Sequence, residues 1–557
     1  MKNRRMELSQ RVRYAIIAGM AGAFLIPQVT FAAPSGGTAV FGGATIPTTS
    51  SDMNITSSNP NNVITWQDYS IANGERVQYD GGAKTNNYLN IVTGANTSNI
   101  NGKIEGGKDV YIVNPNGVIF GKTAEVNVGN LYVSTQERAT LNESNFTGSG
   151  ASPLVNTAAL KSDVVNMGKI TADAVEVHGA HIRFLNAADV TATAPVVLHT
   201  DTANDGYAHI GYEKAAGAPA AAKYQINGAN AAATDNYYQL VSTKEELAAI
   251  NDSAATLAGN YMLANDINLE NNAHTPLGKD ATDSFKGKFD GNFFRIENIN
   301  VSGVDNAGLF GVLNGARIDN VGVVGGTIAS NTGSGNKYAG GIAGNSTNNS
   351  ALYNVYVKNT QISGKSRYNA GIIGQSADTT IDGAYSTARV GTNGGGIVGF
   401  TNGGTIVRNA YSQAVYHANN SPARVLAGSN VPPGTIAIEN IYTNSREISV
   451  NDTSIQGAFK NVFVASSTTG KVDKISSPTE TALDPYSVTT YYDSNTNSGF
   501  SINNTGAPGA KWRIYEGRTM PLLTAFMNGR VDSVGSVGAN YSYRKFNQGN
   551  GSAVAGD

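Results

Sequence analysis

The chain has 557 residues, of which 14% are charged, against about 25% in an average soluble protein. Its 39 Lys and Arg balance 41 Asp and Glu, and this net charge of -2 excludes a large cationic surface for nucleic acid. Cysteine is absent, which excludes disulfides, zinc–thiolate sites, iron–sulfur clusters and thiol nucleophiles. A hydrophobic content of 40% excludes global disorder, and the 65 glycines favour a turn-rich, mainly β chain.

The N-terminus has the pattern of an export signal. Five basic residues precede an apolar run at residues 15–26, and small residues, Thr30 and Ala32, follow it. The run is shorter than the roughly 20 apolar residues that a membrane-spanning helix needs. We therefore expect residues 1–32 to be a cleaved signal peptide and the mature protein to be exported.

Residues 33–200 contain short apolar bursts rich in Val, Ile and Tyr, separated by Gly, Asn, Asp and Thr. Such bursts are typical of β-strands. Their spacing fits a sandwich or a solenoid equally well. The clearest predicted strands are residues 88–92, 109–113, 126–128 and 175–178.

The next segment, residues 201–236, is rich in Ala and Gly, and this composition predicts a linker. Order is expected to resume at Tyr237. The capping-box spacing of Ser242 and Glu245 predicts a short helix over residues 243–251.

A repeated tetrapeptide, Gly-x-x-Gly, appears four times between residues 300 and 415, at intervals of 33, 30 and 25 residues. In each unit an aliphatic residue, then Asn or Gly, and in three units a Tyr follow in constant register. A unit this small buries its apolar face only by stacking on its neighbours, so the repeat predicts a β-solenoid. We expect the paired glycines to lie where coils pass closely. These glycines are Gly308, Gly311, Gly341, Gly344, Gly371, Gly374, Gly396 and Gly399.

A second local motif is Asn114-Pro115-Asn116-Gly117, which joins a predicted strand ending at Val113 to one starting at Val118. Asn at the first position, Pro at the second and Gly at the fourth favour a type I turn. Taken alone, the motif indicates only a turn between two strands.

With residues 63–71 upstream and 124–131 downstream, this turn resembles the N-terminal secretion domain of two-partner secretion exoproteins, the filamentous haemagglutinin family. The resemblance covers about residues 33–200. It implies a right-handed parallel β-helix that a dedicated Omp85-type outer-membrane barrel recognises through periplasmic modules. It also implies that Asn114, Pro115, Asn116 and Gly117 form the export-critical turn.

The tetrapeptide region resembles the GLUG repeats of bacterial surface proteins. Residues 261–269 and 285–292 lead into it, and residues 512–514 and 521–523 close it, so the resemblance spans 237–526. It implies an all-β chain in which a Gly-rich β-solenoid follows the β-helix domain. Residues 527–557 are left as a C-terminal tail.

Candidate catalytic and metal-binding residues are few. His178 and His181 are three positions apart and share a metal only if the strand bends at Gly179, so ordinary coil histidines are the favoured interpretation. Residues 201–206 resemble a calcium loop without its terminal Glu, which favours a turn. Asp290, Asp319 and Asp382 are the carboxylates available to a β-helix glycosidase. We expect no enzyme, no metal and no cofactor.

We therefore predict an exoprotein that is secreted or held at the surface of a diderm bacterium after passing the periplasm. The predicted role is adhesin-like, with a host-cell, matrix or glycan ligand and no nucleic acid. A secreted β-helix enzyme acting on glycans and a passive surface stalk stay open as alternatives. A shortened form of a longer exoprotein also stays open.

Overall fold

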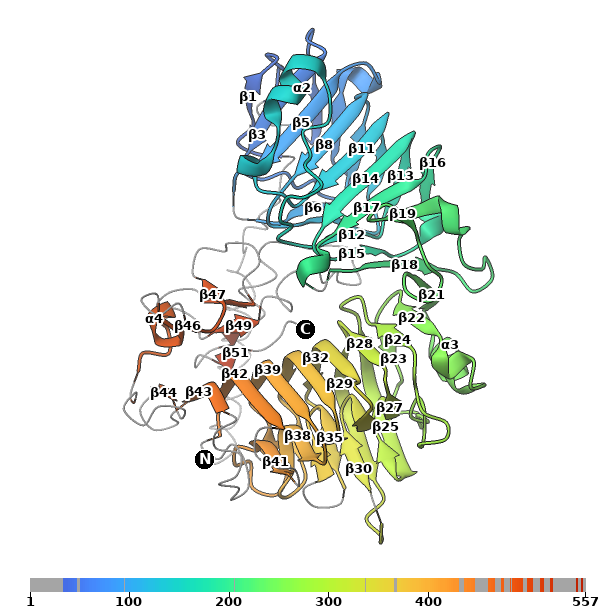
Figure 1. Cartoon of the computed structure of the whole chain (residues 1–557), viewed down its shortest axis with the longest axis vertical. Coiled ribbons are helices and arrows are strands. Elements are labelled where there is room, and N and C mark those ends of the chain that lie inside the picture. Colours follow the sequence, from blue (N-terminus) through green and yellow to red (C-terminus); the bar gives the residue numbers. More distant parts are fainter. Residues whose placement is uncertain are drawn as a thin grey trace, which may run out of the picture.

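The structure is a computed structural model (Figure 1). It describes residues 34–445, apart from residues 48–50, 95, 205, 336, 365–367 and 430–434, together with short segments between residues 459 and 553. The predicted signal peptide and most of the predicted tail lie outside the described residues. None of the helices described is long and apolar enough to span a membrane.

The N-terminal β-helix, which we define as strands β1–β21, is built from three stacks of mainly parallel strands. A nine-stranded sheet contains β1 (Thr38–Phe41), β3 (Asn61–Trp66), β5 (Asn87–Val92), β8 (Asp109–Val113), β11 (Asn130–Ser134), β14 (Ala174–Gly179), β17 (Val196–Thr200), β19 (Tyr224–Ile226) and β20 (Ala229–Asn230). A six-stranded sheet contains β2 (Asp52–Ile55), β4 (Arg76–Tyr79), β7 (Lys103–Glu105), β10 (Glu125–Asn127), β13 (Lys169–Ala172) and β16 (Val190–Ala192). The third stack begins with β6 (Ser98–Ile100), β9 (Val118–Phe120), β12 (Val164–Asn166), β15 (Ile182–Phe184), β18 (Ala208–Tyr212) and β21 (Tyr237–Val241).

Two features create the core: apolar and polar side chains alternate along each strand, and the apolar side chains of one coil stack on those of the next. In β10, Val126 is buried between exposed Glu125 and Asn127, as the two-residue period of a strand requires. Val126 pairs in register with Ile104 on one side and Ile170 on the other. Columns of like side chains therefore run along the axis, and the predicted all-β parallel β-helix is confirmed for this region.

The predicted linker is wrong. Residues 201–236 contain β18, which pairs with β15 and β21, and β19, which pairs with β17. Ile210 and Tyr224 of this segment are completely buried in the core. Most of the Ala- and Gly-rich residues lie in exposed turns between these strands, although Ala231 is buried in the core, because a solenoid coil needs surface loops as well as short strands.

The third stack does not end with the N-terminal β-helix; we call it the continuous sheet. It passes into the C-terminal coils, defined as strands β22–β43, through β22 (Asn260–Leu263), β24 (Lys288–Asp290), β28 (Arg317–Asp319), β32 (Ala351–Lys358), β36 (Thr379–Ser386), β39 (Thr405–Ser412), β42 (Ile436–Thr443) and β43 (Phe459–Ala465). A second line of strands runs through β23 (Ile267–Asn268), β25 (Arg295–Val304), β29 (Gly322–Ser330), β33 (Gln361–Ser363), β37 (Arg389–Val390) and β40 (Val415–Tyr416).

An eight-stranded sheet closes the C-terminal coils. It contains β26 (Asn306–Ala307), β27 (Phe310–Asn314), β30 (Tyr338–Gly340), β31 (Ala343–Thr347), β34 (Asn369–Ala370), β35 (Ile373–Ser376), β38 (Gly395–Thr401) and β41 (Arg424–Ser429). Each tetrapeptide thus begins or crosses a strand of this sheet, once per coil. The regular stacking explains why the sequence repeat keeps its register.

The Asn of each repeat bends the chain at a corner of the coil. Asn320, Asn354 and Asn409 all have φ between 52° and 53°, in the left-handed region that Asn tolerates better than most residues. Gly383 takes the same place with φ of 78°. The Asn354 amide also donates to the Asn320 side-chain oxygen at 3.0 Å, so the corners form a hydrogen-bonded ladder.

The repeat glycines are required for a steric reason, because no space is left for a Cβ atom. An added Cβ would stand 2.6 Å from the Gly278 oxygen at Gly311, 2.5 Å from the Gly371 oxygen at Gly341 and 2.1 Å from the Gly396 oxygen at Gly371. None of the repeat glycines has a positive φ. Backbones of adjacent coils therefore approach too closely at these points for any side chain.

Among the described residues, three short α-helices interrupt the strands: α2 (Glu143–Ser149), α3 (Lys244–Ala248) and α4 (Val488–Tyr491). The helix predicted near Thr243 is α3, which a 3-10 turn extends to Asn251. Its capping box lies one residue later than predicted, because Thr243 rather than Ser242 is the N-cap and Glu246 is its partner.

The molecule bends back on itself. The N-terminal β-helix and the C-terminal coils lie one above the other, and β15 and β18 face the strands around β28 (Figure 1). Side chains meet across this junction: Tyr207 accepts a hydrogen bond from Asn320 at 3.0 Å, although 113 residues separate them in sequence.

Candidate functional site

The predicted export turn joins β8 to β9. The Gly117 N–H donates to the Asn114 carbonyl oxygen at 3.0 Å, which closes the four-residue turn that the motif predicts. Gly117 has φ of 102°, and an added Cβ would meet the Asp163 carbonyl oxygen at 3.0 Å. Only glycine meets both demands at this position.

The side chains of the turn bind it to the neighbouring coil. The buried Asn114 amide donates to the Asn96 carbonyl oxygen and to the Ser98 hydroxyl, each at 2.9 Å. The half-buried Asn116 amide donates to the Gly94 carbonyl oxygen at 2.9 Å. The Asn114 side chain is therefore used inside the β-helix, whereas Pro115 and Asn116 reach the surface.

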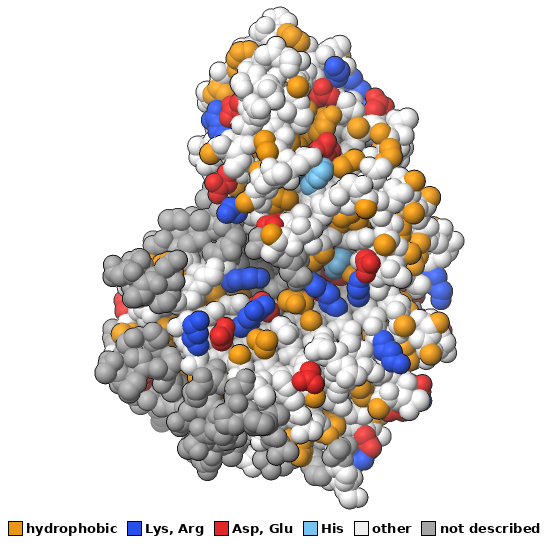
Figure 2. Space-filling model, in the orientation of Figure 1, with side chains coloured by type: hydrophobic (Ala, Val, Ile, Leu, Met, Phe, Trp, Pro, Cys, Tyr) orange, Lys and Arg blue, Asp and Glu red, His pale blue; other side chains and the backbone are white. Residues whose placement is uncertain are grey.

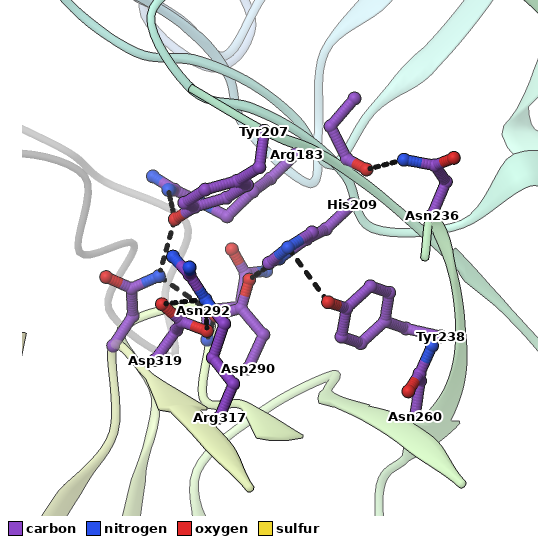
Figure 3. A network of polar contacts seen from close by, with 12 residues as sticks. Arg183, Tyr207, His209, Asn236, Tyr238, Asn260, Asp290, Asn292, Arg317 and Asp319 are labelled. Atoms are coloured by element: carbon purple, nitrogen blue, oxygen red, sulfur yellow. Dashed lines mark hydrogen bonds and ion pairs between the residues drawn. The ribbon is translucent and has the colours of Figure 1, made fainter. Parts of the chain in front are cut away.

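A cluster of buried polar side chains lies at the bend of the molecule; we call it the junction cluster (Figure 3). The His209 Nδ1–H donates to Asp290 at 2.8 Å, and the Tyr238 hydroxyl donates to His209 Nε2 at 2.9 Å. The Arg183 guanidinium donates to the Tyr207 hydroxyl at 3.1 Å. The remaining members are Asn292, Arg317, Asp319 and Asn320.

Charges in this cluster compensate one another. The Arg317 Nε–H lies 2.9 Å from the Asp319 carboxylate, and the Arg317 guanidinium stacks on the Tyr207 ring with 5.4 Å to the centroid. Burial opposes ionisation of Asp290, but the hydrogen bond and charge of His209 lower the pKa of the Asp290 carboxyl. Burial lowers the pKa of His209. Buried charges are stable only when they are paired in this way.

The carboxylates that the sequence offered to a glycosidase are all engaged. Asp290 and Asp319 are in register on adjacent coils but are 0% and 1% exposed. Asp382 accepts from Arg408 at 2.9 Å and from Asn409 at 2.7 Å. A polysaccharide chain would have to displace the whole junction cluster to reach Asp290 or Asp319.

His178 and His181, which are three positions apart in sequence, contact different partners and not each other. His181 binds Asp163 at 2.8 Å, while His178 lies beside His199 of the next coil, with ring centroids 4.3 Å apart and the rings tilted by 36°. Glu176 accepts from His178 Nε2 at 2.7 Å. Within the described part of the chain, Glu176, His178 and His199 are the one group of three whose geometry suits a metal ion. Part of residues 201–206, the weak calcium-loop match, lies outside the described residues.

Sequence reasoning missed this trio because it compared neighbours in sequence. The coil length could have revealed it, because residues 21 positions apart lie in register on adjacent strands. Glu176 pairs with Val197 in this way, and His178 pairs with His199.

The exposed surface carries both signs of charge. On the face in Figure 2, acidic and basic side chains are interspersed over both halves, and several Lys and Arg gather near the junction between them. A mixed surface of this kind agrees with the balanced composition.

The TPS secretion domain family matches residues 32–276, which include the export turn and every strand of the N-terminal β-helix. This chain carries a two-partner secretion domain. The secretion domain begins where the signal peptide was predicted to end, but it continues 76 residues beyond the predicted limit at residue 200. It therefore includes the segment that was predicted to be a linker.

Two curated relatives from Haemophilus influenzae are each named heme/hemopexin-binding protein. One is 32% identical over 165 residues, covering 29% of this chain and 18% of the relative. The other is 34% identical over 105 residues, covering 19% of this chain and 11% of the relative. The chain thus spans less than a fifth of each relative.

Two solved structures also match. The HMW1 secretion domain from Haemophilus influenzae aligns with 77% of this chain and all of that domain, at 15% identity and a TM-score of 0.25. A putative immunoglobulin A1 protease from Bacteroides ovatus aligns with 43% of this chain and 93% of its own, at 18% identity and a TM-score of 0.29.

Proposed function

We propose that the secretion domain directs this chain through a cognate Omp85-type barrel in the outer membrane of a diderm bacterium, after passage through the periplasm. The observation that carries the proposal is the family match over residues 32–276, which contain the export turn. Outside the cell, the C-terminal coils act as an adhesin-like surface. Their Gly-x-x-Gly units are GLUG-type repeats in this proposal.

Recognition in the periplasm takes place on the unfolded chain, by addition of an extended segment to a sheet edge of the barrel's periplasmic modules. Each coil that emerges outside then stacks on the coil before it. Nearest-neighbour stacking of this kind lets folding proceed in one direction, which opposes return of the chain.

The proposed activity is binding, without catalysis. Burial of Asp290 and Asp319 in the junction cluster argues against a glycan-cleaving site at these carboxylates. The extended faces of a solenoid suit contact with a host cell, matrix protein or glycan. The names of the two curated relatives add haem and hemopexin as candidate ligands. A passive stalk is the competing role.

Secretion of Asn116→Ala, compared with Asn130→Ala, tests the export proposal. Both amides bond between coils, Asn116 to Gly94 and Asn130 to Asp109 at 2.6 Å, but only Asn116 lies in the export turn. Each variant is co-expressed with the candidate barrel, and the supernatant is compared with the periplasm. We expect Asn116→Ala to accumulate in the periplasm and Asn130→Ala to reach the supernatant.

Equal secretion of the two variants would contradict the role of the turn as an export signal. Thermal unfolding of both purified proteins is the accompanying control, since a destabilised Asn116→Ala would be retained for a different reason. Asn114→Ala is less informative because it removes buried bonds to Asn96 and Ser98.

Binding of the purified exoprotein to host cells, matrix proteins, haem and hemopexin separates the candidate ligands. Saturable binding without turnover supports the adhesin-like role. Release of reducing ends from polysaccharides would favour an enzyme, and absence of any saturable binding would favour a stalk.

A further inference from the structure

Glu176, His178 and His199 form a compact trio on the outer face of the nine-stranded sheet, near its C-terminal end. Val175 and Val177 of β14 point into the core, so Glu176 and His178, which alternate with them, both face outward. His199 of β17 stands directly opposite His178 in the parallel register. Two residues from one strand and one from the next thus converge on a single point.

The distances suit one ion held by all three side chains. His178 Nε2 lies 2.7 Å and His199 Nε2 lies 3.7 Å from Glu176 Oε1, and the three ligand atoms lie within 4.8 Å of one another. Ligand atoms about 2.1 Å from a tetrahedral zinc ion stand roughly 3.4 Å apart. Small side-chain rotations therefore bring the trio to coordination distance.

Neighbouring groups hold His178 in position. The Gln136 amide donates to His178 Nδ1 at 3.2 Å and to the Val155 carbonyl oxygen at 2.7 Å, while the Val155 N–H donates to Gln136 Oε1 at 3.2 Å. His178 Nε2 is thereby turned toward Glu176. In a metal-bound histidine the other ring nitrogen carries the proton and donates it to a neighbour. Gln136 therefore fixes the orientation of the His178 ring, but the ring tautomer has to change when a metal binds.

The trio is accessible from outside although His178 itself is buried. The side chains of Glu176 and His199 are 26% and 16% exposed, whereas that of His178 is 1% exposed. An ion can approach from the solvent side and meet the two more exposed ligands first.

We propose that Glu176, His178 and His199 form a binding site for a divalent transition-metal ion of the Zn²⁺ class. Two imidazoles and one carboxylate are a ligand set that zinc uses, and three protein ligands leave a fourth position for water or an external group. The ion takes the place of the proton that His178 Nε2 donates to Glu176. That proton moves to His178 Nδ1, and the Gln136 amide flips so that its Oε1 accepts it, which gives up the two hydrogen bonds between Gln136 and Val155.

Titration of the purified protein with Zn²⁺ by calorimetry at pH 7.5, and with Co²⁺ by visible absorption, tests the site. We expect one ion per chain and the absorption of four-coordinate Co²⁺. Glu176→Gln and His199→Gln should each weaken Zn²⁺ binding by about 10-fold or more. His181→Gln is the matched control, because His181 belongs to a separate pair with Asp163 and should leave the affinity unchanged.

Absence of stoichiometric Zn²⁺ binding by the wild-type protein would overturn the site. So would binding that Glu176→Gln and His199→Gln leave intact, or that His181→Gln reduces equally. Thermal unfolding of each metal-free variant shows whether it is folded, and the wild-type midpoint should rise with Zn²⁺ while those of the two trio variants do not. The result is independent of export, since purified protein is used.

Discussion

Gly371 lies where two neighbouring residues leave no room for a side chain. An added Cβ would stand 2.1 Å from both the Gly396 carbonyl oxygen and the Ser386 hydroxyl. We expect Gly371→Ala to lower the free energy of unfolding by about 1–3 kcal/mol, the usual cost of overpacking. Urea denaturation followed by circular dichroism measures the change.

Gly333 supplies the control for this substitution. It is exposed, and no atom lies within 4 Å of the position that its Cβ would take. Gly333→Ala should leave the urea midpoint nearly unchanged. A similar loss at both positions would mean that flexibility, and not space, explains the repeat glycines.

At this scale the sequence predicts well what recurs. The sequence repeat made the paired glycines and the Asn320 and Asn354 corners recognisable, because every coil needs a close backbone approach and a bend at the same position. The metal-binding trio does not recur. His199 belongs to it because the coil from β14 to β17 is 21 residues long, a spacing that shows only when whole coils are compared and not in the residues next to His178.

Strand β18 lies in the core, although the Ala- and Gly-rich composition of residues 201–236 predicted a linker there. Ile210 is fully buried between β15 and β21, in the segment predicted to be a linker. We expect Ile210→Ala to cost about 2–5 kcal/mol of unfolding free energy, as large-to-small core substitutions do. A flexible linker would accept the same change at no cost.

Ala220→Gly is the companion measurement for β18. Ala220 lies in the same Ala- and Gly-rich segment but is exposed in a turn. Thermal unfolding should separate the two variants clearly. Equal midpoints would contradict the assignment of residues 201–236 to the core of the β-helix.

The linker prediction failed for a physical reason. Local composition reflects the turns, which are long and rich in Ala and Gly, whereas β18 contributes only five residues of strand. Stacking on β15 and β21 overrides the weak local preference. Strands such as β8 were predictable because their apolar bursts stand out from their surroundings.

At the scale of the whole molecule, the buried His209 at the bend is expected to make the free energy of unfolding depend on pH. Burial lowers the pKa of His209, so the folded state favours neutral imidazole, while the unfolded chain takes up a proton near its ordinary pKa of about 6.5. The stabilisation is therefore complete above about pH 6.5 and is lost as the pH falls below it, with a limiting slope of about 1.4 kcal/mol per pH unit.

Urea unfolding of the wild type and of His209→Gln between pH 7.5 and 5 measures this contribution. We expect the wild type to lose stability more steeply, because burial of the His209 imidazole outweighs the opposing hydrogen bond and charge of Asp290 and lowers the His209 pKa. His417→Gln, at an exposed position, should keep the wild-type slope. A slope that His209→Gln leaves unchanged would contradict the role of the junction cluster.

The junction itself was beyond prediction. Tyr207 and Asn320 are 113 residues apart and meet only because the molecule folds back. Sequence periodicity describes how a coil contacts the next coil, and it carries no information on contacts between distant coils.

The continuous sheet has a practical consequence for fragments of this protein. Backbone pairing runs from β6 through β21 and β22 to β43 without a break. A secretion domain cut at residue 200 would leave the outer backbone groups of β15 and β17 unpaired, since β18 and β19 would be missing. Unpaired strand edges recruit other chains. A fragment with that end should therefore aggregate, whereas one that retains β18 and β19 keeps β15 and β17 paired.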